Sequence, residues 1–585
     1  MKKKSLALFL SLCLAFSLSS CSILGTKKPE VPRNNVETTT ENKTTIEPVE
    51  TTTEPEETTT GPKETTTGPV ETTTGPKETT TGPKETTTGP KETTTKPVET
   101  TTGPVETTTE EVPPTTSIIY DEPEYKDFSY YSNKDMEANV NYQMNYKPKD
   151  GYVGDIMPYY ENGTYYIFYL KDQGSSFNHS IYLVETKDFL HYVDKGEVLK
   201  ASYDANAQDN WIGTGSVCKV DDTYYFFYTG HNENNSIHER IMVATSKNDL
   251  YHFNKLDGVY IDPKPGLSKR DFRDPDVTYD KAKNCFYLTI TTNPTSGGAV
   301  IVKYTIKKDF SNYSYDTIVY RDTMGFWNLE CSDTFKINDT WYLSYSGQDD
   351  TLFVAKAKSQ FLGYGNSTYG PAVRIEGDYF YAPKAVSNGE DTYFVGWARR
   401  KARPDDGQNE AWAGNILAMK VCQREDDSLY LAPIDGLNSY FKYYHKLENT
   451  SLELHEMTSK KIDRIYESFM ISGDFTFNGK EDFGFILGLN KNDSNLGHIR
   501  ISPKNNKIEF VVNNFDKIET QVTANLKENT KYHFTLVGEG SIYVLYIDGI
   551  ASITCRYYGK ISSDFGLFGS GSDIYLSNLV MKIRS

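Results

Sequence analysis

Three acidic residues, Asp155, Asp274 and Glu330, precede aromatic, strand-like segments at closely similar distances. Carboxylates that converge in a folded protein are costly, because like charges repel and burial raises their pKa values. Such clusters are typical of active sites. Two carboxyl groups in different environments can cleave a glycosidic bond, one as general acid and the other facing the developing oxocarbenium ion. A third can bind sugar hydroxyls.

The segments behind these acids belong to a repeat, in which a turn followed by an aromatic strand occurs five times. The copies are ENGTYYIFYL (161–170), VDDTYYFFYTG (220–230), KAKNCFYLTIT (281–291), INDTWYLSYSG (337–347) and NGEDTYFVGWA (388–398). Their anchor residues recur every 52 to 61 residues: Thr164, Thr223, Asn284, Thr340 and Thr392. Repeats of this length, built from several short strands, predict the blades of a β-propeller. The alternative is a β-sandwich with coincidental similarity.

We therefore expect an all-β fold with a five-bladed propeller over residues 119–440. Asp155, Asp274 and Glu330 lie nine or ten residues before their anchors. Since the first strand of each blade lines the central channel of a propeller, equal offsets predict that the three acids lie at one level near a channel mouth.

Residues 449–585 alternate apolar and polar residues between Gly, Asn and Asp turns, which predicts a C-terminal β-sandwich. All five tryptophans lie between Trp211 and Trp412, so this domain lacks the usual Trp platform for sugar stacking. A supporting role is favoured over a sugar-binding module.

The N-terminal part predicts export and anchoring. Residues 1–21 combine three lysines, an apolar run and a lipobox-like ending at Cys21, which indicates a bacterial lipoprotein signal peptide; an ordinary signal peptide is the alternative. Residues 22–118 are nearly all Thr, Glu, Pro, Gly and Lys, and have almost nothing apolar to bury, which predicts a disordered tether. We expect a lipid anchor on Cys21 and an extracellular, cell-surface location.

Charge and motifs exclude several classes of function. The formal net charge of −18 argues against a nucleic-acid partner, because binding phosphates needs a basic face. The five cysteines beyond the export signal are scattered, without disulfide or metal-ligand spacing. No nucleotide-binding, zinc-protease or nucleophile-elbow motif is present. We expect no cofactor and no metal, and a neutral sugar as the substrate.

Several motifs resemble those of glycoside hydrolase family 32, the fructan hydrolases and invertases. They are FRDPDV (272–277), similar to the family's R-D-P motif, LEC (329–331), similar to its E-C motif, WIGTGSVCKVDDTYYFFYTG (211–230), YFYAPK (379–384) and WAGNILAMKVCQREDDSLYLAP (412–433). The resemblance covers roughly residues 140–585. It implies a five-bladed propeller followed by a β-sandwich.

The resemblance also implies roles for individual residues. Asp155 would be the nucleophile, Glu330 the acid/base, and Asp274 the residue that binds two fructosyl hydroxyls and stabilises the transition state. Substrate-binding residues would be Arg273, Thr214, Trp211, Tyr381 and Trp397. The family retains anomeric configuration, which implies a fructosyl-enzyme intermediate.

The chain departs from the family pattern around the sugar-binding pocket. Gly154 replaces the Asn of the nucleophile motif, Gly213 replaces an aromatic residue, Leu170 a Gln, and Ser332 the Pro after E-C. These changes and the long tether favour a fructan or fructo-oligosaccharide of levan or inulin type over plain sucrose.

Three alternatives stay open: a fructosyltransferase of the same family, an inverting arabinofuranosidase or xylosidase of family 43 type, and a non-catalytic sugar-binding lipoprotein. The sequence fixes neither exo nor endo action, nor the oligomeric state.

Overall fold

The structure is a computed structural model. It describes residues 140–174, 179–349, 351–361, 368–404, 406–447, 450–452, 458–464, 466–487, 497–512, 517–558 and 564–584. These residues are nearly all β, as the sequence predicts, and their only α-helix is α2 (Leu437–Tyr440). The predicted signal peptide with Cys21 and the whole predicted tether lie outside the described residues. None of the described helices is long and apolar enough to cross a membrane.

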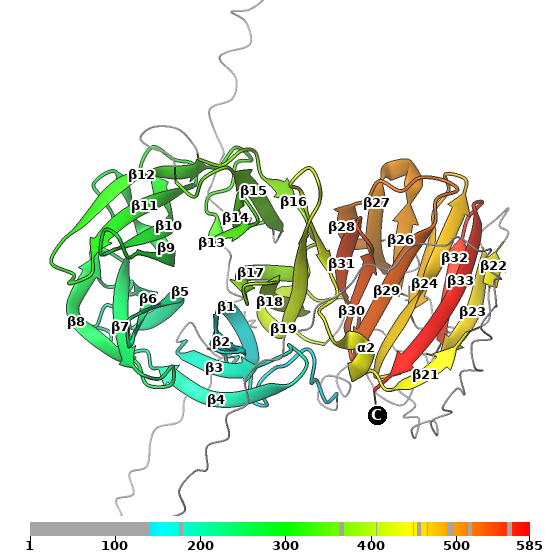
Figure 1. Cartoon of the computed structure of the whole chain (residues 1–585), viewed down its shortest axis with the longest axis horizontal. Helices are drawn as coiled ribbons and strands as arrows, with labels where there is room; N and C mark the ends of the chain where they lie inside the picture. Colours follow the sequence, from blue (N-terminus) through cyan, green and yellow to red (C-terminus); the bar gives the residue numbers. More distant parts are fainter. Residues whose placement is uncertain are drawn as a thin grey trace, which may run out of the picture. The chain divides into compact units, whose positions relative to one another are not determined.

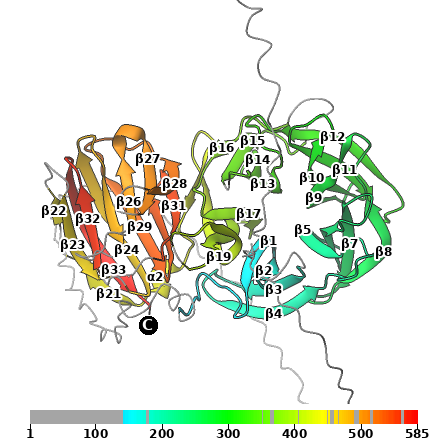
Figure 2. The same cartoon turned by 180° about the vertical axis from the view of Figure 1, so that it is seen from behind.

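Twenty strands form five antiparallel units of four, arranged around a common centre (Figures 1 and 2). We call them units 1 to 5, and together the five-unit domain. Unit 1 contains β1 (Tyr152–Glu161), β2 (Thr164–Asp172), β3 (Ile181–Thr186) and β4 (Tyr192–Leu199). Unit 2 contains β5 (Trp211–Val220), β6 (Thr223–His231), β7 (Glu239–Lys247) and β8 (Asn254–Ile261).

The remaining units repeat this plan. Unit 3 contains β9 (Leu267–Asp280), β10 (Cys285–Pro294), β11 (Val300–Lys307) and β12 (Tyr313–Arg321). Unit 4 contains β13 (Glu330–Ile337), β14 (Thr340–Ser346), β15 (Leu352–Ala357) and β16 (Val373–Arg374). Unit 5 contains β17 (Phe380–Ser387), β18 (Thr392–Lys401), β19 (Glu410–Gln423) and β20 (Leu429–Ala432). The five sequence repeats therefore correspond to the five units.

Aromatic and β-branched residues fill the second strand of each unit, and short turns join it to the first. In unit 1 the turn residues Asn162 and Gly163 have φ of 51° and 80°, the left-handed conformations that a tight hairpin needs. The last unit meets the first through the pair Val153 and Gly414, which joins units 5 and 1 in one eight-stranded sheet.

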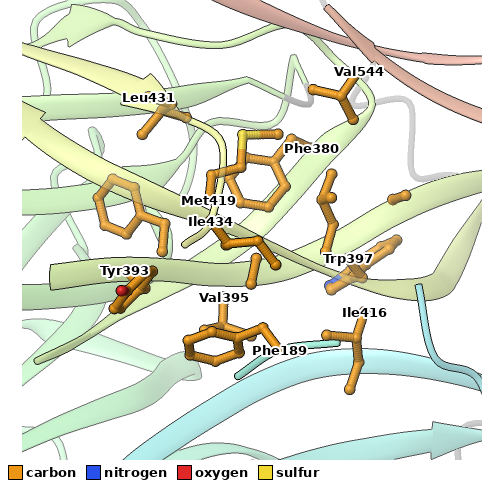
Figure 3. Close-up of a cluster of buried hydrophobic side chains, with 14 of the residues drawn as sticks. Phe189, Phe380, Tyr393, Val395, Trp397, Ile416, Met419, Leu431, Ile434 and Val544 are labelled. Atoms are coloured by element: carbon orange, nitrogen blue, oxygen red, sulfur yellow. The ribbon is translucent and has the colours of Figure 1, made fainter. Parts of the chain in front are cut away.

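Unit 5 has a large apolar core. Phe380 and Trp397 pack there with Met419, and Phe189 reaches it from the turn after β3 (Figure 3). Val544 of the C-terminal domain joins the same cluster. The five-unit domain and the C-terminal domain thus share apolar packing.

The C-terminal domain consists of two antiparallel sheets. One contains β21 (Tyr443–Lys446), β22 (Thr450–Leu452), β24 (Ser468–Asn478), β29 (Tyr532–Glu539), β30 (Ile542–Ile547), β31 (Ala551–Arg556) and β33 (Asp573–Ile583). The other contains β23 (Thr458–Arg464), β25 (Phe483–Leu487), β26 (Gly497–Ser502), β27 (Lys507–Val512), β28 (Lys517–Thr523) and β32 (Asp564–Gly569). Side chains of both sheets, including Phe534 and Phe485, form one buried core, as in a sandwich. The first sheet begins at Tyr443, slightly before the boundary expected at 449.

Polar contacts also connect the two domains. The buried Lys401 ammonium lies 2.6 Å from the Glu519 carboxylate, and the Arg424 guanidinium donates to the backbone oxygens of Gly549 and Ile550 at 3.0 and 2.8 Å. Both domains belong to one compact unit of the chain. These contacts are consistent with a supporting role for the C-terminal domain.

Candidate active site

The first strand of every unit carries a β-bulge, at slightly different distances from the turn that follows. At each bulge two residues lie opposite a single residue of the second strand. The bulged pairs are residues 154–155 in β1, 213–214 in β5, 274–275 in β9, 331–332 in β13 and 382–383 in β17. We call these two residues the first and second bulge positions, and the residue before them the pre-bulge position. Bulges re-aim side chains and are frequent next to active sites.

The three acids occupy three different positions of this motif. Asp155 is at a second bulge position, Asp274 at a first, and Glu330 at a pre-bulge position. The expectation that equal offsets in the sequence give equivalent positions is therefore wrong. Relative to Asp274, Asp155 lies one position later in the motif and Glu330 lies one position earlier. The reason is that the turns differ: β9 and β10 are joined by residues 281–284, whereas β1 and β2 are joined by 162–163. The number of residues between bulge and turn also differs between strands.

Contacts in the site join equal positions of neighbouring units. Glu330, Arg273 and Tyr381 all stand at pre-bulge positions. The Tyr381 hydroxyl donates to Glu330 Oε2 at 2.6 Å, and Arg273 Nη1 lies 3.8 Å from Glu330 Oε1. Glu330 is thus held between side chains from the units on both sides.

The same rule holds at the two bulge positions. Thr214 and Asp155 are both second bulge residues, and the Thr214 hydroxyl donates to Asp155 Oδ2 at 2.6 Å. Asp274 and Cys331 are both first bulge residues, and the Cys331 N–H donates to Asp274 Oδ2 at 2.7 Å. Hydrogen bonds of this kind favour the ionised form of a carboxylate.

Backbone strain accompanies this arrangement. Asp274 and Cys331 have φ of 58° and 52°, and Ala382 at the equivalent position has 47°. Left-handed backbone costs a residue with a side chain roughly 1–2 kcal/mol. Strain of this kind clusters at functional sites.

Asp274 is the most buried of the three acids, with 4% of its surface exposed. Burial, together with the negative charges of Asp155 and Glu330, raises the pKa of Asp274 to about 7, against the opposing effects of Arg273 and of the Cys331 N–H. Near neutral pH this carboxyl is therefore partly protonated and can both donate and accept a hydrogen bond. Burial also raises the pKa of the neighbouring Cys331 thiol, so this residue stays an uncharged thiol.

Arg273 has more acidic partners than the sequence indicates. Its Nε and Nη2 lie 2.9 Å from the two carboxylate oxygens of Glu239, and Nη2 lies 2.8 Å from Asp271 Oδ1. Glu239 is buried, and although burial alone would raise its pKa, Arg273 and His231 lower it overall. Glu239 lies outside the quoted motifs, 34 residues before Arg273, and is not predicted from them. It holds the guanidinium with Nη1 towards Glu330.

The predicted substrate-binding aromatic residues differ in their exposure. Trp211 is partly exposed, and its ring stacks on His231 at 4.8 Å with an angle of 5° between the planes. Trp397 has 1% of its surface exposed and packs edge-on against Tyr381. Trp397 therefore supports Tyr381 from the core, whereas Tyr381 itself contacts Glu330.

Gly154, one of the departures from the family pattern, has a steric explanation. A Cβ atom added at this residue would lie 2.4 Å from two carbon atoms of the Trp412 ring. The centres of the Trp412 and His179 rings lie 4.4 Å apart with an angle of 32° between the planes, and the sequence motifs predict no role for Trp412. The Trp412 ring fills the space that a side chain at position 154 would need.

Two other features bear on the chemistry. Within the described ranges, no three His, Cys, Asp or Glu side chains are grouped so that they could hold a metal ion. A cavity of about 260 Å³ lies away from the three acids, between β15, β16, β20 and the C-terminal domain. Its polar side chains are engaged locally: Arg424 bonds the backbone, and Arg374 lies 2.5 Å from Asp378. It contributes nothing to the acid site.

Residues 146–433 match the sequence model of the glycosyl hydrolases family 32 N-terminal domain. An acid β-fructofuranosidase of Arabidopsis thaliana, described as vacuolar, is 25% identical over 222 residues, which are 36% of this chain and 32% of the plant protein. One from Phaseolus vulgaris is 22% identical over 235 residues, 37% of this chain and 33% of that protein. The matches thus span about a third of these relatives.

Solved structures share the fold over most of their length. A GH32 β-fructofuranosidase of Bombyx mori has a TM-score of 0.59 at 17% identity, covering 77% of this chain and 96% of that one. For a fructan 1-exohydrolase of Cichorium intybus the values are 0.63, 13%, 75% and 96%, and for a fructosyltransferase of A. japonicus 0.63, 12%, 78% and 97%. This chain thus matches the glycosyl hydrolases family 32 N-terminal domain in sequence over residues 146–433, and it shares the fold of these solved structures.

Proposed function

We propose that the protein is a retaining glycoside hydrolase that cleaves β-fructofuranosidic bonds in fructans or fructo-oligosaccharides of levan or inulin type. The observation that carries the proposal is the arrangement of Asp155, Asp274 and Glu330. Each lies at the bulge of a different first strand, and each is held by a residue from a neighbouring unit. Such a cluster is costly as plain structure and suited to glycosidic bond cleavage.

In the first step, the Glu330 carboxyl donates its proton to the leaving oxygen, and the Asp155 carboxylate attacks the anomeric carbon of the fructosyl unit. The glycosidic C–O bond breaks and an ester bond to Asp155 forms. In the second step, Glu330 takes a proton from water, which attacks the same carbon and releases Asp155. The Tyr381 hydroxyl orients Glu330, and the Thr214 hydroxyl donates to the Asp155 carboxylate and orients it.

Asp274 is the residue suited to bind fructosyl hydroxyls. Because its pKa is raised to about 7 by burial, it can donate to one hydroxyl and accept from another. Arg273, whose Nη1 points to Glu330, adds a positive charge next to Asp274 and Glu330. The proton of Asp274 would serve binding, while Glu330, oriented by Tyr381, would transfer the proton to the leaving oxygen.

The test uses the chain from about residue 118 onward and its variants Asp155→Asn and Glu330→Gln. It measures the release of fructose from levan, inulin, 1-kestose and sucrose. Each substitution should lower kcat by at least about a thousandfold, since each removes a group that makes or breaks bonds. Unaltered melting temperatures would show that the variants fold. Wild-type-like activity in either folded variant would refute the hydrolase assignment and favour a sugar-binding protein.

Two further measurements separate the enzymatic alternatives. Retained anomeric configuration in early products, followed by NMR, agrees with the proposal, whereas inversion would indicate a family 43 type mechanism. A fructosyltransferase would release the leaving sugar, which is sucrose from 1-kestose or glucose from sucrose, well in excess of free fructose. Because the solved relatives named above include both hydrolases and a transferase, the fold does not separate these two outcomes.

We further propose that the protein is a lipid-anchored bacterial surface protein, on the basis of the lipobox at Cys21 and the Thr/Pro-rich segment after it. The segment would hold the catalytic domain near polymeric substrates outside the cell. Replacing Cys21 by Ser should move the protein from the membrane fraction to the medium. Membrane association that survives this substitution would contradict the anchor.

A further inference from the structure

Two exposed apolar side chains stand on the loop that leads into Glu330. Eight large apolar side chains are exposed among the described residues, and two of them, Met324 at 47% and Trp327 at 51%, lie on the loop 322–328 between β12 and β13. Exposed apolar surface beside a site that binds ligands indicates a contact surface. Trp327 is the only tryptophan among these eight.

Hydrogen bonds hold this loop in place. The Asp322 carboxylate accepts the backbone N–H groups of Met324, Gly325 and Phe326 at 3.1, 2.6 and 2.8 Å. The Asn293 side-chain amide donates to the backbone oxygen of Trp327. The exposure of the indole is therefore built into the fold, since its backbone is fixed on both sides.

The end of the loop is also fixed. The Asn328 N–H donates to Gln348 Oε1 at 2.9 Å, and the Thr291 hydroxyl donates to Asn328 Oδ1 at 2.6 Å. Asn328 is fully buried. A platform that is ordered before the ligand arrives loses little entropy on binding.

The position of the indole relative to the acids defines what it can contact. The Arg273 guanidinium carbon lies 5.9 Å from the centre of the Trp327 ring, and Arg273 Nη1 lies 3.8 Å from Glu330 Oε1. Trp327 and Glu330, three residues apart in the chain, are thus both neighbours of the Arg273 guanidinium. Asp155 is held from another side, by Thr214 of unit 2.

We propose that Trp327 is the stacking platform for the sugar that leaves, with Met324 extending the same surface. This inference rests on the proposed function, in which Glu330 protonates the leaving oxygen. The departing residue must then lie next to Glu330, where the indole offers a flat apolar face. Trp327 would select fructosides whose leaving group is a sugar ring over those with a small alcohol, and would not contact the fructosyl unit that is transferred to Asp155.

The experiment compares kcat/KM for 1-kestose, whose leaving group is a sugar, with kcat/KM for methyl β-D-fructofuranoside, whose leaving group is methanol. The enzymes are wild type, Trp327→Ala, Trp327→Phe and the control Tyr575→Ala, which removes an equally exposed aromatic residue from β33 of the C-terminal domain. In Trp327→Ala the ratio of the two kcat/KM values should fall about tenfold, mainly through KM for 1-kestose, because a stacking contact is lost. Phe should restore most of the ratio, and the control should keep it.

The outcomes are distinguishable. A ratio in Trp327→Ala that equals the wild-type ratio, or a fall that also occurs in Tyr575→Ala, would overturn the stacking role while leaving the proposed function intact. A wild-type protein that releases fructose from neither compound, nor from levan or inulin, would overturn the proposed function and the inference together. Equal melting temperatures of all four proteins exclude misfolding as the cause of a lower ratio.

Discussion

Replacing Asp274 by Asn should make the protein more stable at alkaline pH and less active. The side chain is 4% exposed, and burial raises its pKa to about 7 from the ordinary value of 3.8. Between these two pH values the folded protein holds a proton that the unfolded chain has released. Stability therefore falls as the pH rises through this window, and above it the ionised, buried Asp274 is a constant penalty.

The size of the penalty follows from the shift. A pKa difference of about 3 units corresponds to about 4 kcal/mol at pH 8, and the Asn variant, which stays neutral, avoids it. For a folded part of some 440 residues that unfolds in one step, this corresponds to a gain of about 4 °C in the melting temperature. At pH 4 the carboxyl is protonated in the folded protein, and the difference should nearly vanish.

The assay is differential scanning calorimetry of both proteins from pH 4 to pH 8, with the exposed residue Asp257 replaced by Asn as the control. Only the difference between the variant and the wild type is interpreted, because other buried carboxyl groups, such as those of Asp333 and Glu376, also have pKa values raised by burial to about 7. A melting-temperature difference for Asp274→Asn that is independent of pH, or larger at pH 4 than at pH 8, would refute the reasoning.

Two smaller changes test the supports of the site. Tyr381→Phe removes the hydroxyl that donates to Glu330 at 2.6 Å, and should lower kcat for fructose release about tenfold with little change in KM; an unchanged kcat would mean that the hydrogen bond does not orient the acid. Gly154→Ala places a Cβ 2.4 Å from the Trp412 ring and should destabilise the protein by about 1–3 kcal/mol, measured by thermal unfolding. Gly370→Ala, where the nearest atom is 3.6 Å away, is its control, and the loss should shrink when Trp412 is also replaced by Ala; equal losses in both backgrounds would exclude a clash.

Strand content and the repeat were predictable from local pattern. Each aromatic segment with its turn is a unit that cannot bury its faces alone, so five copies in a row require a repeated architecture. The sequence also singled out the three acids as candidates, because carboxyl groups recur at similar offsets in three of the copies and the motifs around Asp274 and Glu330 are distinctive. The two-sheet C-terminal domain follows in the same way from alternation of apolar and polar residues.

The relative height of the acids was not predictable. One residue more or fewer in the turn, or between the bulge and the turn, places a side chain at another position of the bulge. The position of a bulge cannot be recognised in the sequence. This is why Asp155 and Asp274 are not equivalent, although their offsets in the sequence nearly agree. Tyr381 is a similar case, since its contact with Glu330 depends on both residues standing just before their bulges.

By itself, then, the sequence determined the number of repeats and the strand-rich character of both domains, and it pointed to the three acids as candidates, because these depend on composition, short-range periodicity and motifs. Only the tertiary structure decided which acid is buried, which side chains hold each one, and that Glu239 and Trp327 contact Arg273. Those properties depend on contacts between units that are distant in the chain, and a pKa or an exposed platform exists only once these units are packed together.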